Sequence, residues 1–170
     1  MAFDWQSLDW ASWFSVAPYS WQAIATAIAC GSVIGLERQL RGKPVGIRTS
    51  SLIVLGTYIF LATSFEFNGG SAVDPSRVIG QVITGIGFLG AGVMMSKDGA
   101  VVGVTSAAAI WMLASIGVMI SMGHLLSAFK MSLLVVGILA GVDILEQHTK
   151  ALTRGVHAKV RTLTGKDRER

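Results

Sequence analysis

Long apolar stretches alternate with short polar segments along most of this chain. Apolar runs of roughly 17–25 residues are long enough for a helix to cross the hydrocarbon core of a bilayer. Five such stretches occur, at residues 16–36, 49–65, 78–95, 104–122 and 125–145. Because backbone groups in hydrocarbon must satisfy their own hydrogen bonds, each stretch is expected to form an α-helix. The pattern predicts an all-α membrane protein, a compact bundle of about five transmembrane helices.

The composition indicates that lipid surrounds most of the chain. Its 170 residues are 52% hydrophobic and only 14% charged, with a mean hydropathy of +0.59. In soluble domains about 25% of residues are charged. The stretches leave no room for a separate globular domain, so we expect a transmembrane bundle at 21–145. A Trp-rich segment at 1–20 precedes it and a basic cytoplasmic tail at 146–170 follows it.

The distribution of Lys and Arg predicts the orientation of the bundle. Basic residues in short loops are retained on the cytoplasmic side of a membrane. With the N-terminus outside, the inner segments hold 12 of the 14 basic residues, and the outer segments hold only Arg77 and Lys130. We therefore expect an outside N-terminus and a cytoplasmic C-terminus. Topology and contact with anionic lipid explain the net charge of +4, and nucleic acid is not an expected partner.

Both ends of the chain carry signals of the membrane surface. Trp10, Trp13, Phe14 and Ala17 share one face of a helix, and tryptophan favours the headgroup boundary. The segment at 1–20 is interpreted as a short amphipathic helix on the outer surface. After the fifth stretch, seven Lys and Arg residues are interleaved with apolar residues at helical spacing. This pattern is typical of a basic amphipathic helix on the inner leaflet.

Small residues recur inside the expected helices. GxxxG pairs lie in the first stretch at Gly31 and Gly35 and in the fifth at Gly137 and Gly141. Membrane helices associate by close packing, which small residues permit. The motif predicts that these helices pack closely, and it does not identify the helices they pack against.

The third stretch contains four glycines in the segment GIGFLGAG, namely Gly85, Gly87, Gly90 and Gly92. The segment matches the dinucleotide pattern GxGxxG, but such a site needs a preceding strand and an acid about 20 residues further on. Close helix packing is the preferred interpretation, because a bare helix surface lets another backbone approach. A kinked or partly unwound helix is the alternative, since each glycine costs roughly 1 kcal/mol relative to alanine.

Polar residues mark the beginning of the third stretch. Asp74 is a good helix N-cap, and Pro75 suits the first helical position. Arg77 and Gln81 are four residues apart and share a helix face. Ionisable groups in membrane helices tend to face a bundle interior or an aqueous cavity. Arg77 and Gln81 therefore form either a polar lining for an ion or ligand, or an interfacial pair with Arg77 extending outward.

The first inner loop combines basic charge with a rigid turn. Residues 35–53 read GLERQLRGKPVGIRTSSLI and include Glu37, Arg38, Lys43 and Arg48. Orientation alone requires only the charge, which is the simpler interpretation. A turn containing glycine and proline that presents guanidinium groups beside a helix start also suits phosphate or carboxylate capture. Glu37 is alternatively a local partner of these basic residues.

The sequence offers no candidate for catalysis, for a cofactor or for a metal site. Magnesium prefers oxygen ligands, usually one or two carboxylates with water. The acidic residues are divided between the two sides of the expected membrane, without a close acidic motif. No Ser-His-Asp or Cys-His arrangement is evident. We therefore expect a protein that is not an enzyme and has no cofactor.

Three sequence blocks together resemble the MgtC/SapB family of bacterial inner-membrane proteins. They are IGLERQLRGKPVGIRTSSLIVLG at 34–56, DPSRVIGQVITGIGFLGAGVMM at 74–95 and VGVTSAAAIWMLASIGV at 102–118. The resemblance implies a five-helix bundle with an outside N-terminus. It brings family motif positions onto Glu37, Arg38, Gly42, Lys43, Gly46, Arg48, Thr49, Asp74, Pro75, Arg77, Gln81, Gly85, Gly87, Gly90, Gly92, Gly103, Thr105 and Trp111.

The resemblance implies a role in adaptation to magnesium limitation and, in pathogens, in survival inside host cells. Family members carry the label magnesium transporter, but regulation of other membrane machinery, including the F-type ATP synthase, is the better-supported family role. Our hypothesis is a non-enzymatic protein that modulates a membrane partner, such as this synthase or a cation transporter. The alternative is an ion or small-solute transporter or channel.

Two features differ from the family pattern. Val102 stands where many members have an arginine, and the tail after Leu145 is too short for the soluble ACT-like domain that longer members carry. The first difference questions any role that needs that arginine's charge. A homo-oligomer is also compatible with the sequence.

Overall fold

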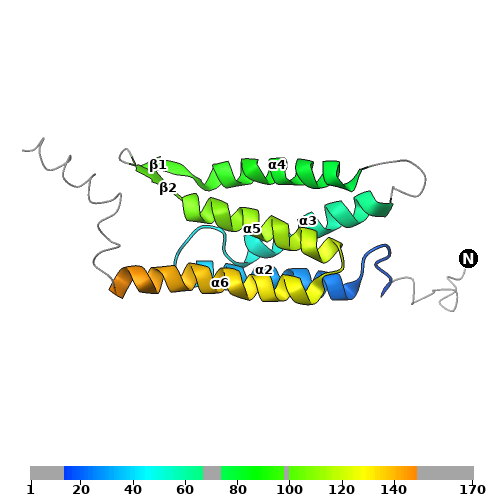
Figure 1. Ribbon diagram of the computed structural model, residues 1–170, viewed down its shortest axis with the longest axis horizontal. Coiled ribbons are helices and arrows are strands. Elements are labelled where there is room, and N and C mark those ends of the chain that lie inside the picture. The colour runs from blue at the N-terminus through cyan, green and yellow to red at the C-terminus, as the bar shows by residue number, and fades with distance from the viewer. Residues whose placement is uncertain (1–13, 67–73, 98–99, 149–170) are drawn as a thin grey trace, which may run out of the picture.

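The computed structural model describes residues 14–66, 74–97 and 100–148, which contain five helices and a short hairpin (Figure 1). Consecutive helices run in opposite directions along the long axis of the bundle (Figure 1). The predicted all-α bundle is confirmed. Most of the expected surface helix at 1–20 and the tail from 149 onward lie outside the described residues. The elements are α2 (Trp21–Leu40), α3 (Ile47–Glu66), α4 (Pro75–Val93), β1 (Met95–Lys97), β2 (Ala100–Val102), α5 (Val104–Ser121) and α6 (Leu125–His148).

Four of these helices, α3 to α6, are long and apolar enough to cross a membrane. The remaining helix, α2, has 20 residues and carries Glu37 and Arg38 near its end. The predicted first stretch starts at residue 16, whereas α2 begins at Trp21. The difference has a local cause, because the hydroxyl of Ser20 accepts a hydrogen bond from the N–H of Ala23 at 3.1 Å and caps the helix there. The outside position of the N-terminus stays a prediction.

A short antiparallel hairpin, which the apolar pattern did not predict, connects α4 to α5. Met95 pairs with Val102, and Ser96 pairs with Val101. The chain enters α5 through Gly103, whose φ of +94° favours glycine. A Cβ atom at this position would also collide with the carbonyl oxygen of Val93 at the end of α4. The connection from the hairpin into α5 therefore requires a residue without a side chain at position 103.

The helix α3 packs closely against α2 and α5, whereas α4 lies at the edge of the bundle and packs mainly on α5. The contact between α2 and α3 is made at the predicted GxxxG pair. A Cβ atom at Gly31 would lie 2.5 Å from the Cα of Ser51, and one at Gly35 would lie 2.6 Å from the Cα of Ile47. The two backbones therefore touch at successive turns, which only glycine permits.

A second close contact joins α5 to α3. A Cβ atom at Gly117 would lie 2.6 Å from the Cβ of Thr57 and 2.7 Å from the carbonyl oxygen of Val54. By contrast, the pair Gly137 and Gly141 on α6 has nothing within 4 Å of either Cβ position among the described residues. The same motif thus marks a tight contact in one helix and an open surface in another.

Replacing Gly117 with alanine should destabilise the bundle. The added methyl group would meet the backbone of α3, and overpacking of this kind typically costs about 1–3 kcal/mol. The matched variant Gly137→Ala adds the same group in open space and should leave stability unchanged or raise it by up to about 1 kcal/mol through helix propensity. Thermal unfolding of both variants in detergent measures the difference. Equal stability of the two would contradict the close contact at Gly117.

Candidate functional site

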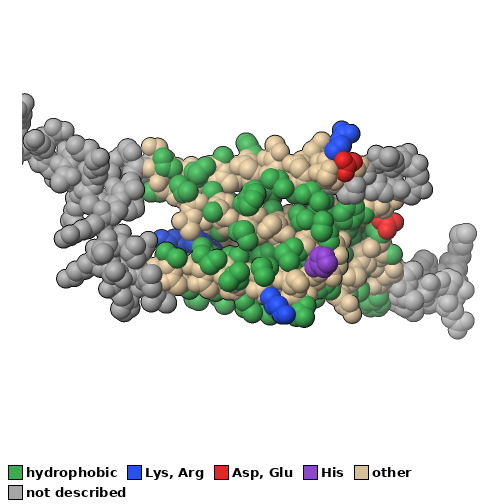
Figure 2. All heavy atoms as spheres, viewed as in Figure 1, with side chains coloured by type: hydrophobic (Ala, Val, Ile, Leu, Met, Phe, Trp, Pro, Cys, Tyr) green, Lys and Arg blue, Asp and Glu red, His purple; other side chains and the backbone are tan. Residues whose placement is uncertain are grey.

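A cavity of about 610 Å³ lies at the end of the bundle that holds the β1–β2 hairpin. It is formed where the end of α2, the following turn, the hairpin, the start of α5 and the last part of α6 come together (Figure 1). Figure 2 shows basic side chains set back between apolar ones at this end of the molecule. The lining residues are Arg38, Lys43, Pro44, Val93, Met95, Val102, Gly103, Thr105, Ser106, Ile138, Leu139 and Val142.

Arg38 is the buried charged group of the cavity. Its side chain lies in the last turn of α2, is only 3% exposed, and donates from Nη2 to the hydroxyl of Ser106 at 2.7 Å. Its Nε atom is also buried and has no hydrogen-bond partner among the described residues. A guanidinium group stays charged in proteins, and a buried charge is costly unless it is paired. Arg38 therefore keeps an unpaired donor, and its charge forms no salt bridge with a described carboxylate.

The neighbouring carboxylate of Glu37 is engaged by a different base. Its Oε1 lies 2.7 Å from the Nε of Arg41, one helical turn further on. Arg41 also donates to the carbonyl oxygen of Ala140 on α6 at 3.4 Å. Both oxygens of Glu37 are buried, and neither accepts a hydrogen bond from the described part of the chain. The structure thus favours the interpretation of Glu37 as a local partner of a loop base.

The rigid turn expected after Arg41 is present and holds Lys43 at the cavity. Gly42 adopts a left-handed conformation with φ +62°. The N–H of Lys43 donates to the carbonyl oxygen of Arg38 at 2.9 Å, and that of Gly42 donates to Gln39 at 3.1 Å. This pair of bonds is the Schellman arrangement that ends many helices. It directly links the backbones of the two basic residues that line the cavity.

The first turn of α5 supplies further hydrogen-bond donors to the cavity. Gly103 is the N-cap and provides no side-chain cap. The first N–H groups of a helix have no partner within the helix, and the helix dipole gives this end a partial positive charge. Thr105 and Ser106 of the same turn line the cavity, and Ser106 is only 2% exposed. The cavity is therefore bordered by cationic side chains, hydroxyl groups and a helix N-terminus.

Asp74 and Arg77 lie at the opposite end of α4 from this cavity. The carboxylate of Asp74 accepts a hydrogen bond from the N–H of Ser76 at 2.9 Å, so the predicted N-cap is present. The pKa of Asp74 lies below its usual value, because the hydroxyl and the N–H of Ser76 stabilise the charged carboxylate. Arg77 is exposed. Asp74 and Arg77 therefore lie at the start of α4 and do not line the cavity.

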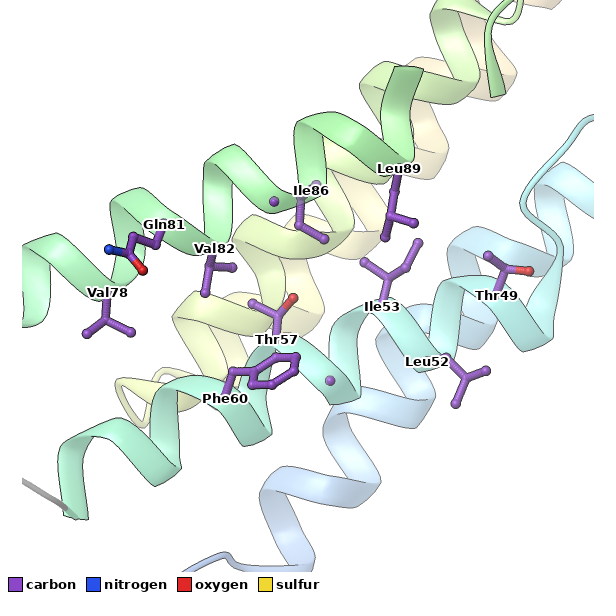
Figure 3. Close-up of a pocket in the computed structure, with 12 residues that line it drawn as sticks. Thr49, Leu52, Ile53, Thr57, Phe60, Val78, Gln81, Val82, Ile86 and Leu89 are labelled. Carbon is purple, nitrogen blue, oxygen red and sulfur yellow. The ribbon is translucent and has the colours of Figure 1, made fainter. Parts of the chain in front are cut away.

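Gln81 lines a separate groove of about 720 Å³ between α3 and α4. Figure 3 shows Val82 and Ile86 of α4 pointing toward α3, with Thr57 pointing back from α3. The walls are mostly apolar, with Thr49 and Thr57 as additional polar residues. Of the sequence candidates, Arg38 and Lys43 thus line the cationic cavity, whereas Asp74, Arg77 and Gln81 lie at or along α4.

The four glycines of α4 do not act as one packing surface within this chain. A Cβ atom at Gly90 would lie 3.6 Å from the Cβ of Ala107 on α5, which is ordinary contact. Nothing described lies within 4 Å of the corresponding positions at Gly85, Gly87 and Gly92. The helix is continuous from Pro75 to Val93, so a partly unwound segment does not describe it. Gly85 lines the open groove between α3 and α4, and none of these three glycines makes a close contact with another described helix.

Two differences from the sequence interpretation concern the basic loop. Arg48, a candidate for anion capture, is exposed at the start of α3 and does not line the cavity. Ser106, which the sequence did not single out, provides the hydrogen bond to Arg38. The available signal was a hydroxyl group at the start of an apolar helix, but its partner lies 68 residues away in the chain. Sequence spacing alone could not identify this pair.

The antiparallel apolar helices with a polar cavity at one end define a multi-pass membrane protein. The chain belongs to the MgtC family, whose model matches residues 24–148. The resemblance noted in the sequence is therefore confirmed. No solved structure matches the chain.

Three curated relatives illustrate the similarity. "Putative magnesium transporter YhiD" of Escherichia coli (strain K12) is 45% identical over 106 residues, covering 59% of this chain and 49% of the relative. An uncharacterized protein of Haemophilus influenzae is 42% identical over 110 residues, covering 60% and 46%. "Protein MgtC" of Salmonella typhimurium (strain LT2) is 36% identical over 118 residues, covering 69% and 49%. The chain spans about half the length of these relatives.

Replacing Ser106 with alanine should destabilise the hairpin end of the bundle. The change removes the hydrogen bond to a buried guanidinium group, and bonds to charged groups contribute about 1.5–3 kcal/mol. Ser115→Ala on the same helix is the control, because the hydroxyl of Ser115 donates only to the local carbonyl of Met112 at 2.9 Å. Thermal unfolding in detergent compares the two. A loss no greater for Ser106→Ala than for Ser115→Ala would count against the pairing with Arg38.

Proposed function

We propose that this protein is a non-enzymatic protein of the inner membrane that supports adaptation to low magnesium by acting on another membrane protein. The observation that carries the proposal is the convergence of the three family-like sequence blocks on one cavity. Arg38 comes from the first block, Met95 from the second and Ser106 from the third. A function shared by the family would be expected to involve the place where these blocks meet.

The charge of this cavity supports regulation in preference to conduction of magnesium. Arg38 and Lys43 both line it and both carry positive charge. Because Arg38 is buried, water screens its field less than it would at the surface. A cavity of this kind attracts anions and disfavours a divalent cation. The proposed link to magnesium is therefore indirect and runs through a partner.

The exposed surface of α4 supports contact with a membrane partner. Phe88 is 81% exposed and Leu89 is 47% exposed, with bare helix surface at Gly85, Gly87 and Gly92 nearby. Membrane helices associate where small residues let backbones come close and larger side chains pack around them. The proposed partner is the F-type ATP synthase or a cation transporter, and a homo-oligomer through the same surface is the alternative.

Deleting the gene should slow growth at low external magnesium and leave growth in magnesium-rich medium unchanged. The wild-type gene should restore growth, and so should Lys130→Gln, because Lys130 is exposed on α6 and does not line the cavity. Lys43→Gln should restore it less well, since it removes a cavity charge. Growth curves across a magnesium titration measure these differences. Unchanged growth of the deletion strain at every concentration would refute the proposal.

Transport of an ion or small solute is the second candidate function. Gln81 and two threonines along the groove between α3 and α4 favour it, as does the name of the Escherichia coli relative. Purified protein in proteoliposomes should show no flux of magnesium if regulation is the function. Flux that Gln81→Leu removes, with helix content unchanged by circular dichroism, would favour transport instead.

A further inference from the structure

We propose that the cavity at the hairpin end binds a phosphate group, held by Arg38, Lys43 and the N-terminus of α5. The inference deepens the proposed function and rests on it in one respect, since it takes this cavity to be the functional site. It goes further by assigning the chemical class of the ligand. The evidence consists of an uncompensated buried charge, the directions from which donors reach the cavity, and the cavity's size.

The buried charge of Arg38 calls for an anion. Its guanidinium group is almost fully buried, and the partner shown for it, Ser106, is a neutral hydroxyl. The adjacent Glu37 pairs with Arg41, and no described carboxylate lines the cavity. An isolated buried charge is strongly unfavourable, and a bound anion would remove this cost. The side chains of α6 from Asp143 onward lie outside the described part, so Asp143 is included in the test.

The donors around the cavity suit phosphate better than carboxylate. Arg38 reaches it from α2, Lys43 from the following turn, and Thr105 and Ser106 from the start of α5. Phosphate has oxygens in a tetrahedral arrangement and accepts bonds from several directions, whereas a carboxylate has two oxygens in one plane. A helix N-terminus combined with an arginine is a recurrent phosphate site.

The cavity has room for more than a phosphate group. Its volume of about 610 Å³ is within the range of ligand sites for small organic molecules. One wall is apolar, formed by Ile138, Leu139 and Val142 of α6. The phosphate group therefore has two sources compatible with the site. It belongs either to a soluble phosphate compound or to a lipid headgroup whose remainder lies against the apolar wall.

Binding to the purified full chain in uncharged detergent tests the proposal. The probes are inorganic phosphate, dioctanoyl phosphatidic acid and dioctanoylglycerol, the last being the same lipid without its phosphate. Microscale thermophoresis gives the affinity, and thermal unfolding provides a second readout. Binding of inorganic phosphate identifies a soluble source, and binding of phosphatidic acid alone identifies a lipid source. Equal binding of the two lipids, or no binding of any probe, would overturn the proposal.

Matched lysine variants locate the binding in this cavity. Lys43→Gln should weaken binding of the phosphate probe about tenfold, the loss expected for one charge-assisted hydrogen bond. Lys43 is exposed, so its replacement leaves the packing of the helices in place. Lys130→Gln removes the same charge outside the cavity and should leave affinity unchanged. Equal weakening by both variants would show nonspecific attraction and would also overturn the proposal.

Two further comparisons separate the remaining explanations. Asp143→Asn should leave the affinity of the phosphate probe unchanged or raise it modestly. Binding that occurs only in this variant would show that the carboxylate of Asp143 occupies the site, and would refute the inference. Growth in low magnesium is measured independently of binding. Phosphate binding without a growth defect on deletion would reject only the proposed function, and a growth defect without binding would reject only this inference.

Discussion

The structure depends on the close approach of α3 to two neighbouring helices at glycine positions. Lipid tails are as apolar as the helices, so helices in a membrane gain stability mainly from close packing rather than from burial. Gly31 and Gly35 bring α2 against one side of α3, and Gly117 brings α5 against another. Because α2 and α5 both pack on α3, the distance between α2 and α5 at the hairpin end is fixed. This arrangement places Arg38 of α2 within 2.7 Å of Ser106 of α5, and the cavity forms around that pair.

Stability does not best explain why polar groups are buried at the hairpin end of the bundle. Replacing a buried charged network with well-packed apolar residues is often neutral or stabilising. The rest of the core follows that rule, with apolar residues such as Leu113 and Ile116 fully buried between the helices. Glu37 and Arg38 are exceptions, each with a buried polar atom that lacks a hydrogen-bond partner among the described residues. Natural sequences depart from local rules mainly at functional sites, and Arg38 lines the cavity to which all three family-like blocks contribute.

The helices and several of their ends follow from patterns that are local in sequence. Apolar length predicted the described helices, Asp74 with Pro75 predicted the start of α4, and the first GxxxG pair predicted a close contact. The hairpin was missed because its strands have three residues each, too few for alternation to be visible beside an apolar helix. Only part of the cavity could be predicted from the sequence. Arg38 and Lys43 stand out by their charge, whereas Ser106 resembles the small residues around it. Neither its pairing with Arg38 nor the open surroundings of Gly85, Gly87 and Gly92 can be read from spacing, because both depend on contacts between distant segments.

The position of the cavity gives a ligand a way to influence the rest of the bundle. Groups from α2, the turn that follows it and α5 would contact the same anion, so it would bind only while these segments stay together. A ligand that binds only this arrangement stabilises it by about 2.7 kcal/mol at a concentration 100 times its Kd. The hairpin also joins α4 to α5, and α4 packs mainly on α5 within the described chain. Coupling between sites is reciprocal, so a partner that contacts α4 in one arrangement would change the affinity of the cavity by the same factor. Measuring either affinity with and without the other ligand therefore decides whether the cavity and α4 act together, and equal values would show that they do not.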